Sequence, residues 1–110
     1  MITVTIPDKY AEALNALGDV QTAVDLALQR YTIDQITSRI ARLRERDQAY
    51  QAKYGMDYPS FAQRTAQDEA FVRQVETKTN PLWENDLADW EFCVKGIEDW
   101  TRTLQTILLT

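Results

Sequence analysis

Four acids at the start of the last predicted helix have the chemistry to bind another molecule: Glu84, Asp86, Asp89 and Glu91. Carboxylates stabilise the positive end of a helix dipole, which alone explains their position. They are equally suited to meet the basic site of a partner protein. Because the chain has no histidine and one cysteine, Cys93, we expect no metal ligands and no cofactor here.

The same predicted helix carries aromatic residues, which are enriched at interface hot spots. Trp90 falls on the apolar stripe and is expected in a helical core, whereas Phe92 lies off the stripe. The patch that we predict to face a partner combines aromatic and acidic side chains: Trp83, Glu84, Asp86, Phe92 and Trp100.

A run of four arginines lies farther up the chain: Arg39, Arg42, Arg44 and Arg46. These cations suit either phosphates or an acidic partner. The intervening Glu45 and the following Asp47 also fit an ordinary solvated helix face.

Catalysis is not expected. There is no histidine to act as a base near neutral pH, and the three glycines stand alone instead of forming a phosphate loop. Neither of the two serines lies in a nucleophile motif. An enzyme with a carboxylate pair stays open on composition alone, but no pattern in the sequence marks its pocket.

The first seven residues alternate apolar and hydroxylated side chains, a pattern typical of a half-buried strand. Every later segment has helical periodicity. A lone strand cannot satisfy its own main-chain groups, so we expect it to pair with the same strand of a second copy. Ile2, Val4 and Ile6 would then face inward, while Thr3 and Thr5 would face outward.

Two helices are predicted next. The first spans about residues 9–17 and ends at Gly18. Asp19 is a good N-cap for the second, which either runs unbroken from Val20 to Tyr54 or bends near Thr32. From residue 36 its apolar stripe narrows to coiled-coil spacing: Ile36, Ile40, Leu43, Asp47, Tyr50 and Tyr54.

Three further helices complete the expected order. Ser60 with Gln63 has the spacing of a capping box for a short helix. Another helix covers about residues 68–78, and Asn80 with Pro81 is typical of a helix start. The last helix runs from about residue 82 to 109, with a stripe of three- and four-residue steps: Leu87, Trp90, Val94, Ile97, Thr101, Leu104 and Leu108. We expect the two seamed helices to pack together, within one chain or across a dimer.

The net charge of −5 is unevenly distributed, because residues 1–55 are balanced and residues 56–110 hold ten acids against five bases. The acidic half is unsuited to nucleic acid and suits a basic protein. Acidic helix faces that keep a dimer soluble are the alternative interpretation. Without a long apolar stretch, a leader pattern or a cysteine pair, we expect a cytoplasmic protein that does not enter a membrane.

Residues 2–31, read as strand, short helix, glycine turn and longer helix, resemble a ribbon-helix-helix unit. The segment from Asn80 to Glu91 is also similar to prokaryotic antitoxin-type proteins. The resemblance implies an intertwined homodimer whose ribbon enters the DNA major groove. Many members of this family are repressors, and many of those are antitoxins whose C-terminal extension silences a toxin.

On this resemblance, residues 1–31 form the dimerisation and DNA-binding head, and residues 32–110 form a helical partner-binding extension. The implied DNA contacts are Thr3, Thr5, Lys9, Asp19 and Val20. The implied dimer interface is Ile2, Val4, Ile6, Leu14, Val24 and Leu28. Family ribbons usually carry Arg, Lys, Asn or Gln outward, so a face with two threonines departs from the pattern and predicts weak DNA binding.

The sequence therefore predicts a mainly helical antitoxin-type regulator. It would bind operator DNA as a dimer through its ribbon and neutralise a cognate toxin through its C-terminal helices. The alternative is a dimeric helical interaction scaffold that does not bind DNA.

Overall fold

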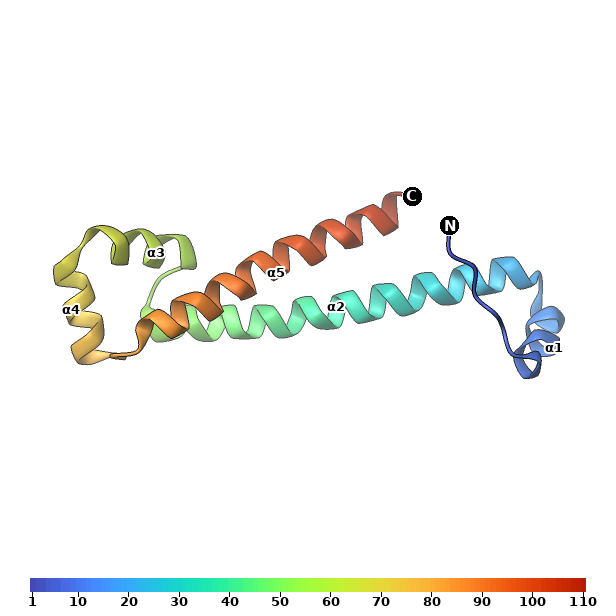
Figure 1. Cartoon of the computed structure of the whole chain (residues 1–110), viewed down its shortest axis with the longest axis horizontal. Coiled ribbons are helices and arrows are strands. Elements are labelled where there is room, and N and C mark those ends of the chain that lie inside the picture. Colours follow the sequence, from blue (N-terminus) through green and yellow to red (C-terminus); the bar gives the residue numbers. More distant parts are fainter. The chain divides into compact units, whose positions relative to one another are not determined.

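The structure is a computed structural model that covers residues 1–110, and helices are its only regular secondary structure (Figure 1). They are α1 (Asp8–Leu17), α2 (Val20–Tyr54), α3 (Tyr58–Gln67), α4 (Glu69–Lys78) and α5 (Trp83–Leu109). The prediction of a mainly helical chain is confirmed. The chain divides into two compact units, Met1–Gln35 (unit 1) and Ile36–Thr110 (unit 2), with the boundary inside α2. No helix is both long enough and apolar enough to cross a lipid bilayer.

The predicted N-terminal strand is wrong, and with it the ribbon-helix-helix fold. Residues 1–7 form an extended segment without strand pairing, and no β-strand occurs in the chain (Figure 1). Ile2 and Val4 are 90% and 76% exposed. Alternating β-branched residues favour an extended backbone, but a strand also needs a neighbour's main-chain groups, and no segment supplies them. Within the chain, residues 1–7 therefore form no strand, and Ile2 and Val4 are left uncovered.

Helix α1 follows Pro7, whose carbonyl oxygen accepts a hydrogen bond of 3.0 Å from the backbone N–H of Tyr10. It ends at Gly18, whose φ of 149° is a conformation that side-chain-bearing residues rarely adopt. No residue of α1 is buried. Unit 1 is therefore helical without having a core of its own.

Helix α2 is continuous, so of the two predicted forms the unbroken helix is correct. The Thr32 hydroxyl donates to the carbonyl of Leu28 at 2.5 Å, which satisfies the hydroxyl without a break in the helix. The helix ends at Tyr54, and Gly55 then adopts a left-handed φ of 74°. Both ends agree with the glycine and N-cap signals in the sequence.

In unit 2, the second part of α2 and helix α5 form an antiparallel pair (Figure 1). The predicted seam of α2 is buried at Ile36, Ile40, Leu43 and Tyr54. The seamed helices thus pack within one chain. On α5, Trp90 and Cys93 are fully buried, whereas the predicted seam residue Leu108 is 57% exposed.

The two helices approach closely at Gly96. A Cβ atom added there would lie 2.9 Å from Leu43 Cδ1, which is closer than carbon atoms normally approach. The glycine thus lets the α2 side chain pack directly against the backbone of α5. This contact accounts for a residue that otherwise weakens the interior of a helix.

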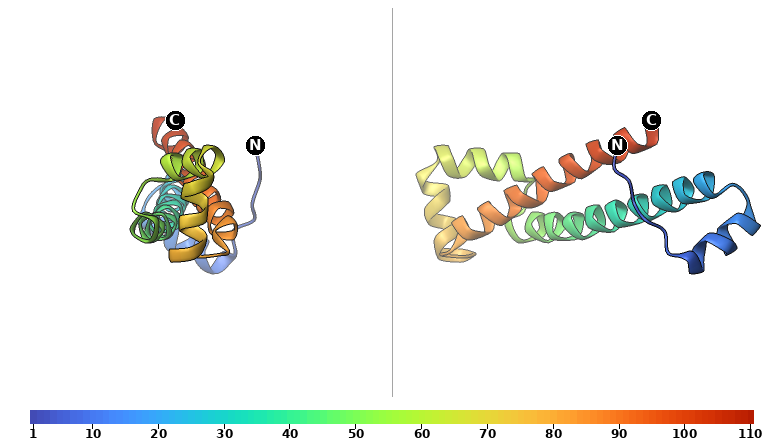
Figure 2. Two further views of the ribbon diagram at one scale, coloured as in Figure 1. Left: turned by 90° about the vertical axis from the view of Figure 1, so that its left-hand side faces the viewer. Right: turned by 45° about the vertical axis from the view of Figure 1, so that its right-hand side comes forward.

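Helices α3 and α4 meet at a corner beyond the end of the pair (Figure 2). An aromatic core lies among these helices, α2 and α5. Its buried members are Tyr54, Phe61, Phe71, Val75 and Trp90. Phe61 is completely buried, and its ring centroid lies 4.3 Å from that of Tyr54 and 5.5 Å from that of Trp90. Both ring pairs are tilted, and aromatic contacts at such distances add to the burial energy. This cluster ties α2, α3, α4 and α5 together.

Two predicted helix starts are corrected. Helix α3 is capped by Asp57, whose carboxylate accepts from the backbone N–H of Ser60 at 2.9 Å, so Ser60 lies inside the helix. Helix α5 begins at Trp83, two residues after Pro81, because the Asn80 side chain accepts from the N–H of Leu82 and forms a turn first. Asp68 caps α4 in a matching way, since it accepts from the N–H of Phe71.

Candidate functional site

The acids of α5 that were predicted to face a partner divide into two groups. Asp86 and Asp89 point to α2 and take part in the fold, whereas Glu84 is exposed. Glu91 forms an ion pair of 2.8 Å with Lys95 on the same helix. The acids available to a partner are therefore fewer than the sequence indicates.

Asp89 is held by two groups of α2. It forms an ion pair with Arg46, and it accepts a hydrogen bond of 2.6 Å from the Tyr50 hydroxyl. The hydrogen bonds from Arg46 and Tyr50 lower the pKa of Asp89, and the bond to Asp89 raises the pKa of Tyr50. Asp89 is thus charged near neutral pH and already satisfied within the chain.

Asp86 has three partners. It accepts from Lys53 Nζ at 2.6 Å, from the Tyr54 hydroxyl at 2.5 Å and from Asn80 Nδ2 at 3.2 Å. Burial alone raises the pKa of Asp86, but these hydrogen bonds outweigh it and lower the pKa. Burial, together with the bond to Asp86, raises the pKa of Tyr54 to about 12.

A third polar contact explains the only acid in the apolar seam of α2. Trp90 is completely buried, and its indole Nε1 donates to Asp47 Oδ1 at 2.7 Å. A buried indole N–H without an acceptor is costly. Asp47, Asp86 and Asp89 therefore form a polar ladder that fixes the register of α2 against α5.

Phe92 is the exposed aromatic residue of α5. It is 63% exposed, and the guanidinium of Arg46 lies 5.9 Å from the centroid of its ring. A shallow hollow beside it is lined by Ala88, Glu91, Phe92, Lys95, Gly96 and Asp99. An exposed phenyl ring set among small and charged residues is a suitable anchor for a protein partner.

The two tryptophans of the predicted patch are placed differently. Trp83 is partly buried and packs edge-on against Phe61, with 6.2 Å between the ring centroids. Trp100 is also partly buried, and the Arg39 guanidinium lies 5.5 Å from its ring centroid. Arg39 and Arg46 thus each cover a different aromatic ring of α5.

The residues predicted to contact DNA lie in unit 1. Thr3 and Thr5 are exposed on the extended segment, and the Lys9 ammonium lies 5.0 Å from the ring centroid of Tyr10. At the start of α2, the Asp19 carboxylate accepts from the backbone N–H and the hydroxyl of Thr22, both at 3.0 Å. These hydrogen bonds lower the pKa of Asp19, and its negative charge occupies the place where a helix N-terminus would hold a phosphate.

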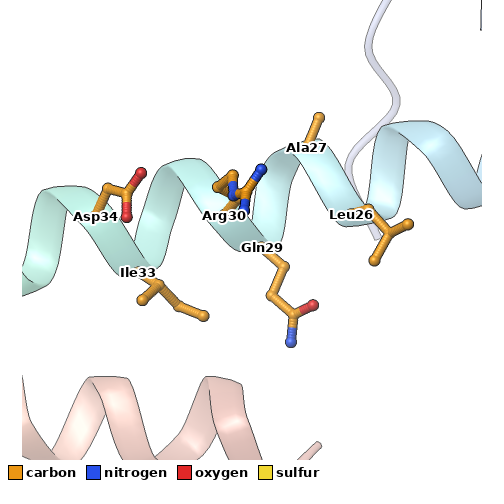
Figure 3. Close-up of a pocket in the computed structure, with 6 residues that line it drawn as sticks. All are labelled: Leu26, Ala27, Gln29, Arg30, Ile33 and Asp34. Carbon is orange, nitrogen blue, oxygen red and sulfur yellow. The ribbon is translucent and has the colours of Figure 1, made fainter.

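Residues predicted at the dimer interface are incompletely covered within the chain. Leu14 and Val24 are partly buried, and Leu28 is 59% exposed. Val20, which was predicted to contact DNA, is also partly buried. A hollow along α2 is lined by six residues of this one helix: Leu26, Ala27, Gln29, Arg30, Ile33 and Asp34 (Figure 3). In Figure 3, Leu26 and Ile33 extend to the same side of the helix. Several apolar side chains of unit 1 are therefore left exposed within the chain.

No group of three or more His, Cys, Asp or Glu side chains is placed to hold a metal ion. Cys93 is a free, buried thiol. No family model, curated protein or solved structure matches this chain.

Proposed function

We propose that this protein is a homodimeric helical interaction protein. Unit 1 joins two copies, and unit 2 binds a second, basic protein in the manner of an antitoxin. The observation that carries the proposal is the apolar surface of unit 1. None of the residues of unit 1 is buried, and many of its large apolar side chains are exposed. The DNA-binding prediction depended on a two-stranded ribbon, so it is not part of the proposal.

The exposed apolar surface of unit 1 is close in area to one side of a stable interface. Besides the terminal Met1, seven large apolar side chains of unit 1 are more than half exposed: Ile2, Val4, Tyr10, Leu17, Leu26, Leu28 and Tyr31. If each buries on the order of 100 Å², one copy contributes about 700 Å². Stable interfaces bury about 800 Å² per partner.

A second copy is the occupant that fits this surface. Every copy of the chain carries the same uncovered apolar residues, and a two-fold contact buries each of these residues on both copies. Unit 1 has five acids and only Lys9 and Arg30 as cations, so phosphates are repelled and the apolar residues remain the attractive feature.

The dimer is tested by light scattering coupled to size-exclusion chromatography on the full chain. We expect a dimer for the wild type and a monomer for Leu28→Lys, because a charge would be buried in the interface. Leu82→Lys is the matched control, since Leu82 is 64% exposed but lies in unit 2. A monomeric wild type, or equal loss of the dimer in both variants, contradicts the proposal.

The partner-binding role of unit 2 is supported by Phe92 and by the acidic half of the chain. Exposed aromatic anchors with acids at the rim suit a basic protein, because the ring supplies buried area and the charges steer association. Co-purification with the products of neighbouring open reading frames tests this role. We expect Phe92→Ala to abolish capture of a basic partner and Leu108→Ala, at a similarly exposed site, to retain it.

A further inference from the structure

A hollow between α3, α4 and the end of α2 combines cations with an apolar floor. It has a volume of about 320 Å³ and is lined by Tyr54, Arg64, Phe71, Gln74, Val75, Lys78 and Thr79. This size lies at the lower end of the range for small-molecule sites. No acid lines it, although acids outnumber bases in the chain by seventeen to twelve.

Neither cation at the rim forms an ion pair within the chain. None of the five ion pairs of the chain involves Arg64 or Lys78. The acid nearest to Arg64 in the sequence is Asp68, whose carboxylate caps α4 by accepting from the N–H of Phe71 at 3.1 Å. The two positive charges therefore lack a carboxylate of the chain to neutralise them, and they sit where an anion would be stabilised.

The floor of the hollow is apolar and rigid. Phe71 and Val75 are 9% and 5% exposed and belong to the aromatic core of unit 2. The Arg64 guanidinium lies 4.2 Å from the ring centroid of Phe71, which holds the cation over the floor. Tyr54 contributes its ring, because its hydroxyl is bonded to Asp86.

Polar groups complete the rim. Thr79, which has a hydroxyl, and Gln74, which has a side-chain amide, also line the hollow, and both residues are exposed. Together with Arg64 and Lys78, they offer several hydrogen-bond donors to one anionic group. The floor beneath them is suited to an apolar body of a few atoms.

We propose that this hollow binds a small organic anion, in which a carboxylate or phosphate contacts Arg64 and Lys78 and an attached apolar group packs on Phe71. The two rim cations give charge-assisted hydrogen bonds, and the floor adds hydrophobic contact that inorganic anions cannot use. The site is independent of Phe92 and of the exposed surface of unit 1, so it stands apart from the proposed interaction function.

The proposal is tested by NMR titration of the full-length protein with benzoate and phenyl phosphate. Two control probes each lack one feature: benzamide has the apolar ring without the charge, and inorganic phosphate has the charge without an apolar group. We expect the two organic anions to shift the signals of Phe71 and Lys78 in a saturable way. Benzamide and inorganic phosphate should bind at least about tenfold more weakly, since each missing interaction contributes roughly a factor of ten.

Variants locate the site. Arg64→Gln and Lys78→Gln should each weaken benzoate binding about tenfold, while the helical circular dichroism stays unchanged. Arg73→Gln is the matched control, because it removes the same charge from an α4 side chain that is 82% exposed and does not line the hollow. The absence of saturable shifts, equal binding of benzamide, or an equal effect of Arg73→Gln overturns the proposal.

Discussion

Replacing Asp47 by leucine tests whether its contact with Trp90 stabilises the protein, because the seam pattern and the structure predict opposite changes in the free energy of unfolding. From the seam pattern alone, leucine at this position completes the apolar stripe of α2 and stabilises the protein. In the structure, Asp47 accepts the only polar group of Trp90, a side chain with no exposed area. Asp47→Leu would leave that N–H buried without an acceptor, so we expect a loss of stability.

The size of the effect follows from two terms. An unsatisfied buried N–H costs about 1–3 kcal/mol, and the bond to a charged acceptor is at the upper end of that range. Because position 47 is only partly buried, leucine regains about 1 kcal/mol of hydrophobic burial. The net expectation is a decrease of about 1–2 kcal/mol in the free energy of unfolding.

Urea denaturation followed by tryptophan fluorescence measures this change, since all three tryptophans lie in unit 2. Asp47→Asn keeps an oxygen acceptor and should lose less than the leucine variant. In a Trp90→Phe background the N–H is gone, so Asp47→Leu should become neutral or stabilising. If Asp47→Leu raises the free energy of unfolding of the otherwise wild-type protein, the proposed role of the indole contact is refuted.

Further predictions concern other contacts of unit 2. The phenol of Tyr54 has its pKa raised from 10.0 to about 12, so it favours folding below pH 10 and loses this contribution as the pH rises to 12. Relative to Tyr54→Phe, the wild type should lose about 2 kcal/mol over that interval, as measured by urea denaturation at each pH. Gly96→Val should cost about 1–3 kcal/mol through overpacking against Leu43, and Leu43→Ala should relieve part of that penalty in a double-mutant cycle. Asp57→Ala should lower the thermal midpoint through the loss of about 1 kcal/mol of helix capping, a result that would be contradicted by an unchanged midpoint.

Much of the helical framework is predictable from the sequence because its signals are local. Gly18, Asp19 and Gly55 mark helix ends through backbone conformation and capping, and each acts within a few residues. The spacing of the α2 seam likewise identifies its buried face. These features depend on one segment at a time.

The N-terminal segment shows where local patterns are insufficient. Alternation of Ile2, Val4 and Ile6 with threonines specifies an extended backbone, but whether a strand forms depends on a neighbour that the pattern does not describe. The prediction that Ser60 caps its helix is wrong for a similar reason, since Asp57 also lies three residues before a backbone N–H that needs an acceptor. The sequence cannot rank two competing caps by type alone.

The candidate sites depend on pairings between helices. The acids of α5 look like a charged surface in the sequence, yet Asp86 and Asp89 face Tyr54 and Tyr50 once the two helices are in register. The one local signal for this ladder is Asp47, an acid at an apolar seam position. The hollow between Arg64 and Lys78 has no sequence signal, because it forms only where α3 and α4 meet.

Because Cys93 is completely buried, the reactivity of its thiol reports transient local opening of unit 2. A thiol reagent reaches this sulfur only when α5 separates locally from its neighbours, and burial also raises the pKa of the thiol. The labelling rate, compared with that of an unfolded chain, therefore gives the fraction of time that this part of unit 2 spends open. A ligand or partner that clamps unit 2 should slow the labelling without touching the cysteine.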